Sequence, residues 1–445
     1  MFTGYHILIK FFNNGNTAND FTKEDYIHFE KNSIEGDLQG ITEKLDYLSS
    51  LGIDLIYLGP VFESMTTHGY DTTDYFSLSE NVSLPEKEKR LNVLNILIEE
   101  AHKRNIRVIL DIVLNHASKY YNFDSIPEGF KPVTEPPQSR QEERWQKMFI
   151  FWNFSDSSTR EFLTEVGRYW LKNTNADGFR LDHALGIPQD FWFYFITEMK
   201  KIRNDVILLG EVWDDVKDEK DNYNLIKSFK SFEGKNIFTS LFDFFVYDSF
   251  EKIFVNKSKN MKEFCEILKM SSDINDEKFS LTYFIENHDL KRFIDICNDK
   301  EIWKNVMKLL FTLSGNIMLE YGNEICIKGD KEYIFPSESG RVAMIFPENH
   351  TKEQTDCFTF TKDLIKMRKN NEELQSGKYF FREADNDYLI FEKILENRKS
   401  VVMIFRKSTE YFFDNTYKSL TDNTVFKGYV NVPEGVYILK CCDEI

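Results

Sequence analysis

Ionisable and amide side chains follow four short apolar runs of the sequence. They are Asp111, Asn115 and His116 after the run from Ile106, Arg180 and Asp182 after the run from Ala176, Glu211 after the run from Val206, and Asn287, His288 and Asp289 after the run from Ser280. Any one of them could be a helix N-cap, because Asp and Asn are favoured between a strand and a helix. Together they supply four carboxylates, two imidazoles and one guanidinium, which is more than capping alone predicts.

This set of side chains favours the cleavage of an acetal. In that reaction one carboxylate attacks the anomeric carbon, and one carboxylic acid protonates the leaving oxygen. The sequence has no HExxH, no GxSxG, no phosphate-binding loop and no glycine-rich dinucleotide fingerprint. The residues therefore point to a carboxylate-based hydrolysis that requires no cofactor.

The spacing of apolar runs predicts the scaffold that brings these side chains together. Eight short apolar runs alternate with amphipathic segments of helical period. The runs lie near or begin at Tyr5, Asp54, Ile106, Ala176, Val206, Ile237, Ser280 and Gly315. Such alternation is typical of parallel βα units, and eight units predict an α/β fold closed as a (β/α)8 TIM barrel. The active site of such a barrel lies at the carboxyl ends of its strands.

Two segments depart from this alternation. Residues 117–148 contain four prolines and little apolar periodicity, which predicts an insertion after the third strand. The barrel then comprises residues 1–116 and 149–374. From residue 375 the helical period gives way to short alternating runs, which predicts a C-terminal all-β domain over 375–445.

The composition is that of a folded globular protein, with 42% hydrophobic and 29% charged residues among 445. The formal net charge of −17 repels polyanions, so we expect neither a nucleic-acid nor an anionic-membrane partner. No apolar run reaches the ~18 residues of a membrane-spanning helix, and the N-terminus lacks secretory-signal features. The six cysteines lack CxxC spacing, so we expect free thiols and a cytoplasmic location. Nothing in the sequence predicts the oligomeric state.

Four motifs resemble, in order, the signature regions of the α-amylase family, glycoside hydrolase family 13. They are DIVLNH (111–116), GFRLD (178–182), GEVW (210–213) and FIENHD (284–289). The resemblance extends to GDLQG at Gly36, HGYDTTDY at His68 and YGNE at Tyr321, and covers roughly residues 1–370. FIENHD and GDLQG are most similar to the neopullulanase, cyclomaltodextrinase and maltogenic amylase branch. Members of that branch often carry an extra N-terminal β-domain, whereas this barrel pattern begins almost at Met1.

The resemblance implies a catalytic role for three carboxylates. Asp182 matches the nucleophile, and Arg180 would keep that carboxylate ionised while also contacting substrate. Glu211 matches the general acid/base, which must be protonated before the attack. Asp289 matches the third carboxylate, which binds sugar hydroxyls and stabilises the oxocarbenium-like transition state.

Other matches imply substrate-binding and supporting roles. His116 and His288 match the imidazoles that bind hydroxyls of the sugar in subsite −1. Tyr70 matches the aromatic residue that stacks on that sugar. Asp111 and Asn287 are expected to support the shape of the site.

Three departures from the family pattern qualify the resemblance. Leu185 and Gly186 replace a Lys-His pair of many α-amylases, which puts contacts beyond the cleavage point in doubt. His183 directly after the nucleophile has no role that the pattern fixes. Asn115 matches a calcium ligand of secreted α-amylases, but further oxygen ligands are not identifiable, so we expect calcium to be dispensable, although a bound ion remains an alternative.

The leading prediction is a retaining hydrolase of α-1,4-linked glucans that acts on short maltodextrins or cyclodextrins. A transglycosylase of the same family is a second interpretation, because a sugar hydroxyl can replace water in the second step. A non-catalytic carbohydrate-binding protein is a third, and the intact carboxylates Asp182, Glu211 and Asp289 argue against it.

Overall fold

A central sheet of eight parallel strands organises the molecule in the computed structural model, which describes residues 1–214, 219–332 and 338–442. In spatial order the strands are β13 (Ser240–Leu241), β10 (Ile207–Gly210), β9 (Gly178–Leu181), β5 (Arg107–Ile112), β2 (Leu55–Leu58), β1 (Thr3–Ile7), β15 (Asn316–Glu320) and β14 (Thr282–Tyr283). A parallel bridge between Phe242 and Thr282 joins the two outer strands. The predicted TIM barrel is therefore confirmed, and each of the eight predicted runs contributes one strand.

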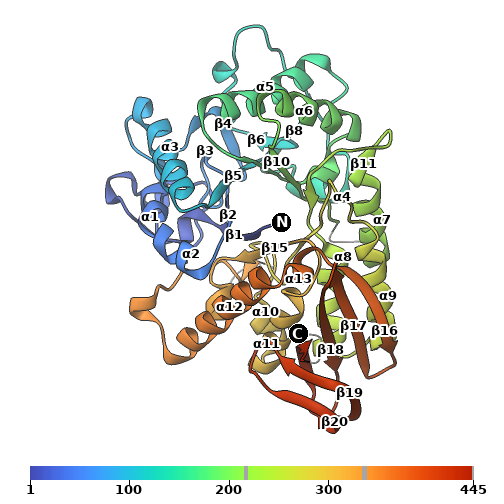
Figure 1. Ribbon diagram of the computed structural model, residues 1–445. Helices are drawn as coiled ribbons and strands as arrows, with labels where there is room; N and C mark the ends of the chain where they lie inside the picture. Colours follow the sequence, from blue (N-terminus) through green and yellow to red (C-terminus); the bar gives the residue numbers. More distant parts are fainter. Residues whose placement is uncertain (215–218, 333–337, 443–445) are drawn as a thin grey trace.

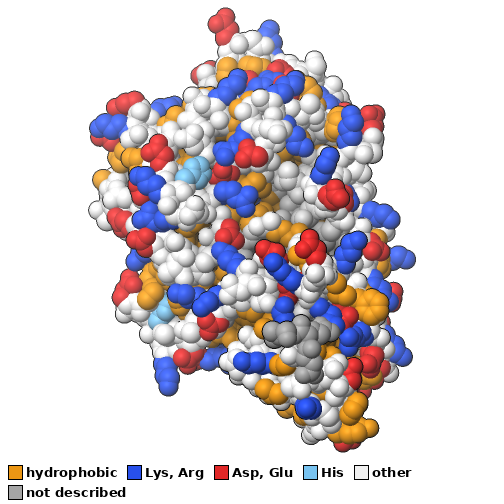
Figure 2. Space-filling view, in the orientation of Figure 1, with side chains coloured by type: hydrophobic (Ala, Val, Ile, Leu, Met, Phe, Trp, Pro, Cys, Tyr) orange, Lys and Arg blue, Asp and Glu red, His pale blue; other side chains and the backbone are white. Residues whose placement is uncertain are grey.

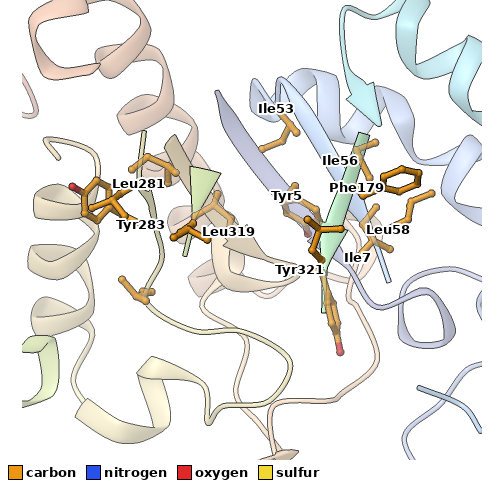
Figure 3. Packing of buried hydrophobic residues seen from close by; sticks show 14 of the residues in the cluster. Tyr5, Ile7, Ile53, Ile56, Leu58, Phe179, Leu281, Tyr283, Leu319 and Tyr321 are labelled. Carbon is orange, nitrogen blue, oxygen red and sulfur yellow. The ribbon is translucent and has the colours of Figure 1, made fainter. Parts of the chain in front are cut away.

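Alternation along each strand sends one set of side chains outward and the other into the barrel. Tyr5, Ile7, Ile56 and Leu58 belong to the large cluster between the strands and the surrounding helices (Figure 3). The interior holds a separate apolar cluster, which includes Leu55, Ile109, Leu209, Phe284 and Met318. Polar side chains take interior positions near the carboxyl ends of the strands, and a small hydrogen-bonded group of Ser240, Thr282 and Asn316 lies at β13, β14 and β15, so the barrel is a packed core beneath a polar mouth.

Helices surround the barrel as a ring (Figure 1). They are α1 (Leu38–Glu43), α2 (Leu45–Leu51), α3 (Lys87–Lys103), α5 (Ser157–Asn173), α6 (Gln189–Ile202), α7 (Glu219–Lys230), α8 (Phe244–Phe250), α9 (Met261–Ser272), α10 (Phe293–Cys297), α11 (Lys300–Leu310) and α12 (Lys352–Asn370). Several begin at a capping side chain that accepts from the first turn, such as Asp37, Asp156 and Asp243. Short hairpins, β3 (Phe62–Ser64) with β4 (Thr72–Leu78) and β11 (Ser231–Phe232) with β12 (Lys235–Asn236), extend the connections.

The insertion after β5 forms a three-stranded antiparallel sheet of β6 (His116–Ser118), β8 (Phe149–Trp152) and β7 (Thr134–Glu135), with the short helix α4 (Arg140–Trp145). This sheet therefore includes residues on both sides of the predicted limits 117–148. Tyr121 is buried and packs against Tyr75 and Trp152, so it belongs to the core beneath the insertion.

The chain ends in a six-stranded antiparallel sheet (Figure 1). It follows the short helix α13 (Glu372–Ser376) and consists of β16 (Lys378–Ala384), β17 (Tyr388–Leu395), β18 (Arg398–Phe405), β19 (Thr409–Ser419), β20 (Val425–Val432) and β21 (Gly435–Cys441). The predicted C-terminal all-β domain is thus present. Its Lys393 is buried, contacts the Ser314 hydroxyl of the barrel, and has its side-chain nitrogen 3.7 Å from the centre of the Tyr379 ring of the same sheet.

Charges of both signs are interspersed on the face seen in Figure 2, so the negative net charge is not gathered there in one acidic patch. Over the three described stretches of chain, the helices are too short or too polar to cross a bilayer.

Candidate active site

Asp182 and Glu211 stand directly beyond the ends of β9 and β10. The Asp182 amide donates to the Ile112 carbonyl at 3.1 Å, and the Glu211 amide donates to the Leu181 carbonyl at 3.1 Å. Both residues therefore continue the hydrogen-bond ladder of the barrel. This rigid attachment brings carboxylates from separate segments to one mouth, as the strand-end positions predict.

Arg180 joins three of the carboxylates in a buried network. Its Nη1 donates to both carboxylate oxygens of Asp111 at 3.0 Å and to Asp182 Oδ1 at 2.6 Å. Its Nη2 lies 2.6 Å from Glu211 Oε1. One guanidinium thus fixes the nucleophile and the acid/base predicted from the sequence relative to each other.

Burial and the charges of this network together raise the pKa of Asp182. Burial raises the pKa of Asp182, and the Glu211 and Asp111 carboxylates raise it further against the opposing Arg180 cation. Three carboxylates around one cation carry a net negative charge when all are ionised. The Asp182 carboxyl therefore retains its proton to higher pH than an exposed aspartate would.

Asp289 lies in a different electrostatic setting. Burial would raise its pKa, but the neighbouring His288 and Arg341 cations hold the pKa of Asp289 well below the ordinary value. Arg341 Nη2 donates to Asp289 Oδ1 at 2.7 Å, and His288 Nε2 lies 3.1 Å from Asp289 Oδ2. Asp289 is therefore ionised at neutral pH. The Asn287 side chain accepts from the Asp289 amide at 2.9 Å, in line with a supporting position.

Tyrosines beside Asp111 form one wall of the mouth. The Tyr57 and Tyr70 hydroxyls donate to Asp111 Oδ2 at 2.7 and 2.8 Å. The Tyr70 ring stacks on His288 with 5.1 Å between centroids and 3° between planes, and it remains partly exposed. An aromatic face and an imidazole thus lie side by side next to the carboxylates, an arrangement that can bind the apolar face and hydroxyls of a sugar.

The insertion contributes another wall of the mouth. The Trp145 ring, from α4, packs edge to face against the His183 ring, with 5.0 Å between centroids. Its centroid lies 5.8 Å from that of the His116 ring. The His183 amide donates to Glu211 Oε2 at 3.1 Å, so the backbone of this residue helps to orient the Glu211 carboxylate. Burial lowers the pKa of His116 to about 3, so its imidazole is neutral.

Asn115, which matches a calcium ligand in relatives, is hydrogen-bonded to the insertion. Its Nδ2 donates to Glu142 Oε1 at 3.1 Å, and Glu142 Oε2 accepts from the Gln138 amide. A calcium ion takes about six to eight oxygens, whereas the Asn115 amide group here donates to a carboxylate of the insertion. The two side chains thus tie the insertion to the end of β5.

Sequence reasoning missed several residues that shape the mouth. Arg341 stands in an irregular segment without a recognisable motif, so only its contact with Asp289 reveals it. Tyr57, His6 and Glu320 lie within apolar runs, where they read as ordinary strand residues. Their interior positions in the strand alternation are the signal that could have found them.

The comparisons with known proteins agree with this geometry. The chain matches the family described as "Alpha amylase, catalytic domain" over residues 6–143 and 143–362. The chain belongs to the α-amylase family. A maltogenic α-amylase of Bacillus acidopullulyticus is 30% identical, with 91% of this chain and 69% of the relative covered. A cyclomaltodextrinase of Thermoanaerobacter pseudethanolicus is 29% identical, with 98% and 77% covered.

Solved structures support the fold of this α-amylase family member. An Anoxybacillus α-amylase superposes with a TM-score of 0.80 at 23% identity, covering 99% of this chain and 98% of that one. The expectation of a glycoside hydrolase is therefore confirmed at the level of the family. The predicted branch is also confirmed, since relatives named cyclomaltodextrinase and maltogenic amylase are among the matches.

Proposed function

We propose that this protein hydrolyses α-1,4-linked glucans with retention of anomeric configuration, and that short maltodextrins or cyclodextrins are its substrates. The observation that carries the proposal is the Arg180 bridge between Asp182 and Glu211. It keeps two carboxylates close to one another, as a retaining mechanism requires. The names of the relatives, maltogenic α-amylase and cyclomaltodextrinase, support this substrate class.

The first step forms a covalent intermediate. An Asp182 carboxylate oxygen attacks the anomeric carbon, and the bond from that carbon to the glycosidic oxygen breaks. The leaving oxygen takes a proton from Glu211. The Arg180 cation opposes the effect of burial on the pKa of Asp182 and so favours the ionised carboxylate that attacks.

The second step releases the sugar. Glu211, now a carboxylate, accepts a proton from water as the water oxygen attacks the anomeric carbon, and Asp182 leaves as a carboxylate. Asp289 remains ionised and places negative charge beside the oxocarbenium-like transition state. Tyr70 and His288 bind the sugar in subsite −1, with His116 as a further hydroxyl contact.

We also propose that the enzyme acts on soluble oligosaccharides inside the cell without calcium. The six cysteines are free, in keeping with a reducing compartment. The Asn115–Glu142 hydrogen bond occupies the side chain that matches a calcium ligand in relatives.

Proton NMR of the newly formed reducing end tests the reaction. We expect the α-anomer to appear first when maltotetraose, γ-cyclodextrin or pullulan is hydrolysed. A β-anomer as the first product would contradict a retaining mechanism. Chromatography of the same samples separates hydrolysis from transfer, because products longer than the substrate arise only when a sugar hydroxyl replaces water.

A further inference from the structure

Three buried side chains at one side of the mouth form a cluster that the proposed reaction uses only in part. His6 and Glu320 occupy paired positions on the neighbouring strands β1 and β15, and His288 follows β14. One potential ligand atom of each lies within 4.8 Å of the others. None of the three is more than 3% exposed. The cluster is thus assembled by three adjacent strands of the barrel.

Each of these side chains has a buried polar atom without a hydrogen-bond partner in the part of the chain that the structure describes. These atoms are His6 Nε2, His288 Nδ1 and Glu320 Oε1. Leaving such an atom unpaired costs about 1–3 kcal/mol. Three of them in one cluster indicate that a ligand, rather than the protein, satisfies them.

The remaining contacts orient the two imidazoles. His6 Nδ1 lies 2.6 Å from Glu320 Oε2, and the His6 ring stacks on Tyr57 with 4.1 Å between centroids. The His288 ring lies 4.8 Å from the His6 ring and is covered on another side by Tyr70. Both imidazoles are thus held in place beside the Glu320 carboxylate, each with a ring nitrogen that has no hydrogen-bond partner among the described residues.

We propose that His6, His288 and Glu320 form an inhibitory binding site for a divalent cation of the zinc type. Two imidazoles and one carboxylate are a ligand set that zinc takes, with water in the fourth position. Calcium needs about six to eight oxygens, which this cluster cannot provide. Zinc bonds of about 2.0–2.2 Å hold ligand atoms roughly 3.3 Å apart, so side-chain rotations that move atoms by about 1 Å close the site.

The cation and the sugar exclude each other at this site. This part of the inference rests on the proposed function, in which His288 binds a hydroxyl of the sugar in subsite −1. A cation bound to His288 engages that imidazole and adds positive charge beside Asp289. Occupation of the site therefore lowers the affinity for substrate.

Zinc titration of the full-length, chelator-treated protein tests both parts. Equilibrium dialysis with metal analysis is expected to give one high-affinity zinc per chain. The melting temperature should rise with zinc. Hydrolysis of maltotriose should be inhibited competitively, with an inhibition constant equal to the dissociation constant, and a chelator should restore activity.

Variants identify the ligands. His6→Gln and Glu320→Gln should each weaken zinc binding by at least about tenfold, and the second variant serves if the first is unfolded by circular dichroism. His102→Gln, on α3, and Cys326→Ser are matched controls that should bind zinc as the unaltered chain does. No stoichiometric zinc, unchanged binding in both cluster variants, or loss of binding in a control would overturn the site.

The two parts fail separately. Zinc that binds with the expected variant pattern but leaves maltotriose hydrolysis unaffected would overturn the competition and leave the site. A chain that hydrolyses no α-glucan would overturn the proposed function, while dialysis and melting still decide whether the cation site exists.

Discussion

At the scale of single residues, the proposed chemistry depends on the ion pairs that one arginine forms with several carboxylates. Arg180 contacts Asp111, Asp182 and Glu211 at the same time, so no carboxylate of this group can change its charge without affecting the others. The four sequence motifs predicted which residues meet, because each lies at the carboxyl end of a barrel strand or directly after it. They could not predict Arg341, whose position depends on an irregular segment that folds back over Asp289.

The two carboxylates bridged by Arg180 should differ in how their loss can be rescued. Asp182→Asn and Glu211→Gln are each expected to lower kcat by about 10³-fold or more with maltotriose. An α-maltosyl fluoride substrate needs no protonation of its leaving group, so it should restore the first step in Glu211→Gln but not in Asp182→Asn. Rates with both substrates measure this. Rescue of Asp182→Asn, or normal rates in either variant, would contradict the assigned roles.

Arg341 is a positioning residue for Asp289, and its removal should change the pH profile. Arg341→Met leaves Asp289 and Glu30 without this cation, so the pKa of Asp289 should rise from its depressed value. Activity should fall by about 10²-fold at neutral pH, and the acid limb of the pH profile should move to higher pH, because the pKa of Asp289 rises when one of its cationic neighbours is removed. Profiles of kcat/KM against pH test this. Arg168→Met, on the outer face of α5, is the matched control, and parallel profiles would contradict the positioning role.

At the scale of elements, periodicity in the sequence predicted what is long or buried and missed what is short. The eight barrel strands appear as apolar runs because both of their faces are covered. The two-residue strand β7 and helix α4 have no such signal, so the internal structure of the insertion was beyond prediction. Gly186 shows a further limit, since a Cβ there would lie 2.6 Å from Asn115 Oδ1, a clash that spacing alone cannot reveal.

The junction between β5 and the insertion should be insensitive to chelators. The Asn115 side chain is hydrogen-bonded to Glu142 and needs no metal ion to hold it in place. Treatment with EDTA is therefore expected to change neither activity nor melting temperature measurably. Asn115→Ala should instead lower the melting temperature by several degrees, since it leaves the Glu142 carboxylate buried without this partner. Loss of activity with EDTA that calcium restores would contradict this account of Asn115.

At the scale of the whole molecule, stability should depend on pH through a carboxyl group remote from the proposed catalytic residues. Burial raises the pKa of Glu324 to about 7, and its Oε1 accepts from the hydroxyls of Tyr5 and Tyr47. The folded state therefore binds more protons than the unfolded state between the ordinary pKa near 4.5 and about 7. Stability is expected to fall as pH rises through this window.

Glu324→Gln tests this dependence because it cannot ionise. The difference in free energy of unfolding, variant minus unaltered chain, should increase by about 2 kcal/mol when the pH is raised from 5 to 8. Denaturant unfolding at both pH values measures the difference. Glu372→Gln, on the exposed surface of α13, is the control and should leave the pH dependence unaltered. A constant difference between Glu324→Gln and the unaltered chain would contradict a raised pKa for Glu324.

The overall shape of the mouth should limit the length of glucan that contributes to binding. Trp145 and His183 meet at the wall formed by the insertion, and Leu185 packs partly into the core instead of extending a polar side chain toward the substrate. The region beyond the cleavage point therefore offers few contacts for a long chain. With few subsites, no further binding energy is gained after a few glucose units, so kcat/KM should rise from maltose to about maltotetraose and then level off.

Trp145→Ala should flatten this rise, whereas Tyr120→Ala, on the exposed surface of the same insertion, should preserve it. The measurement is kcat/KM over a series from maltose to soluble starch, and a continued steep rise toward the polymer would mean that the site is a long cleft.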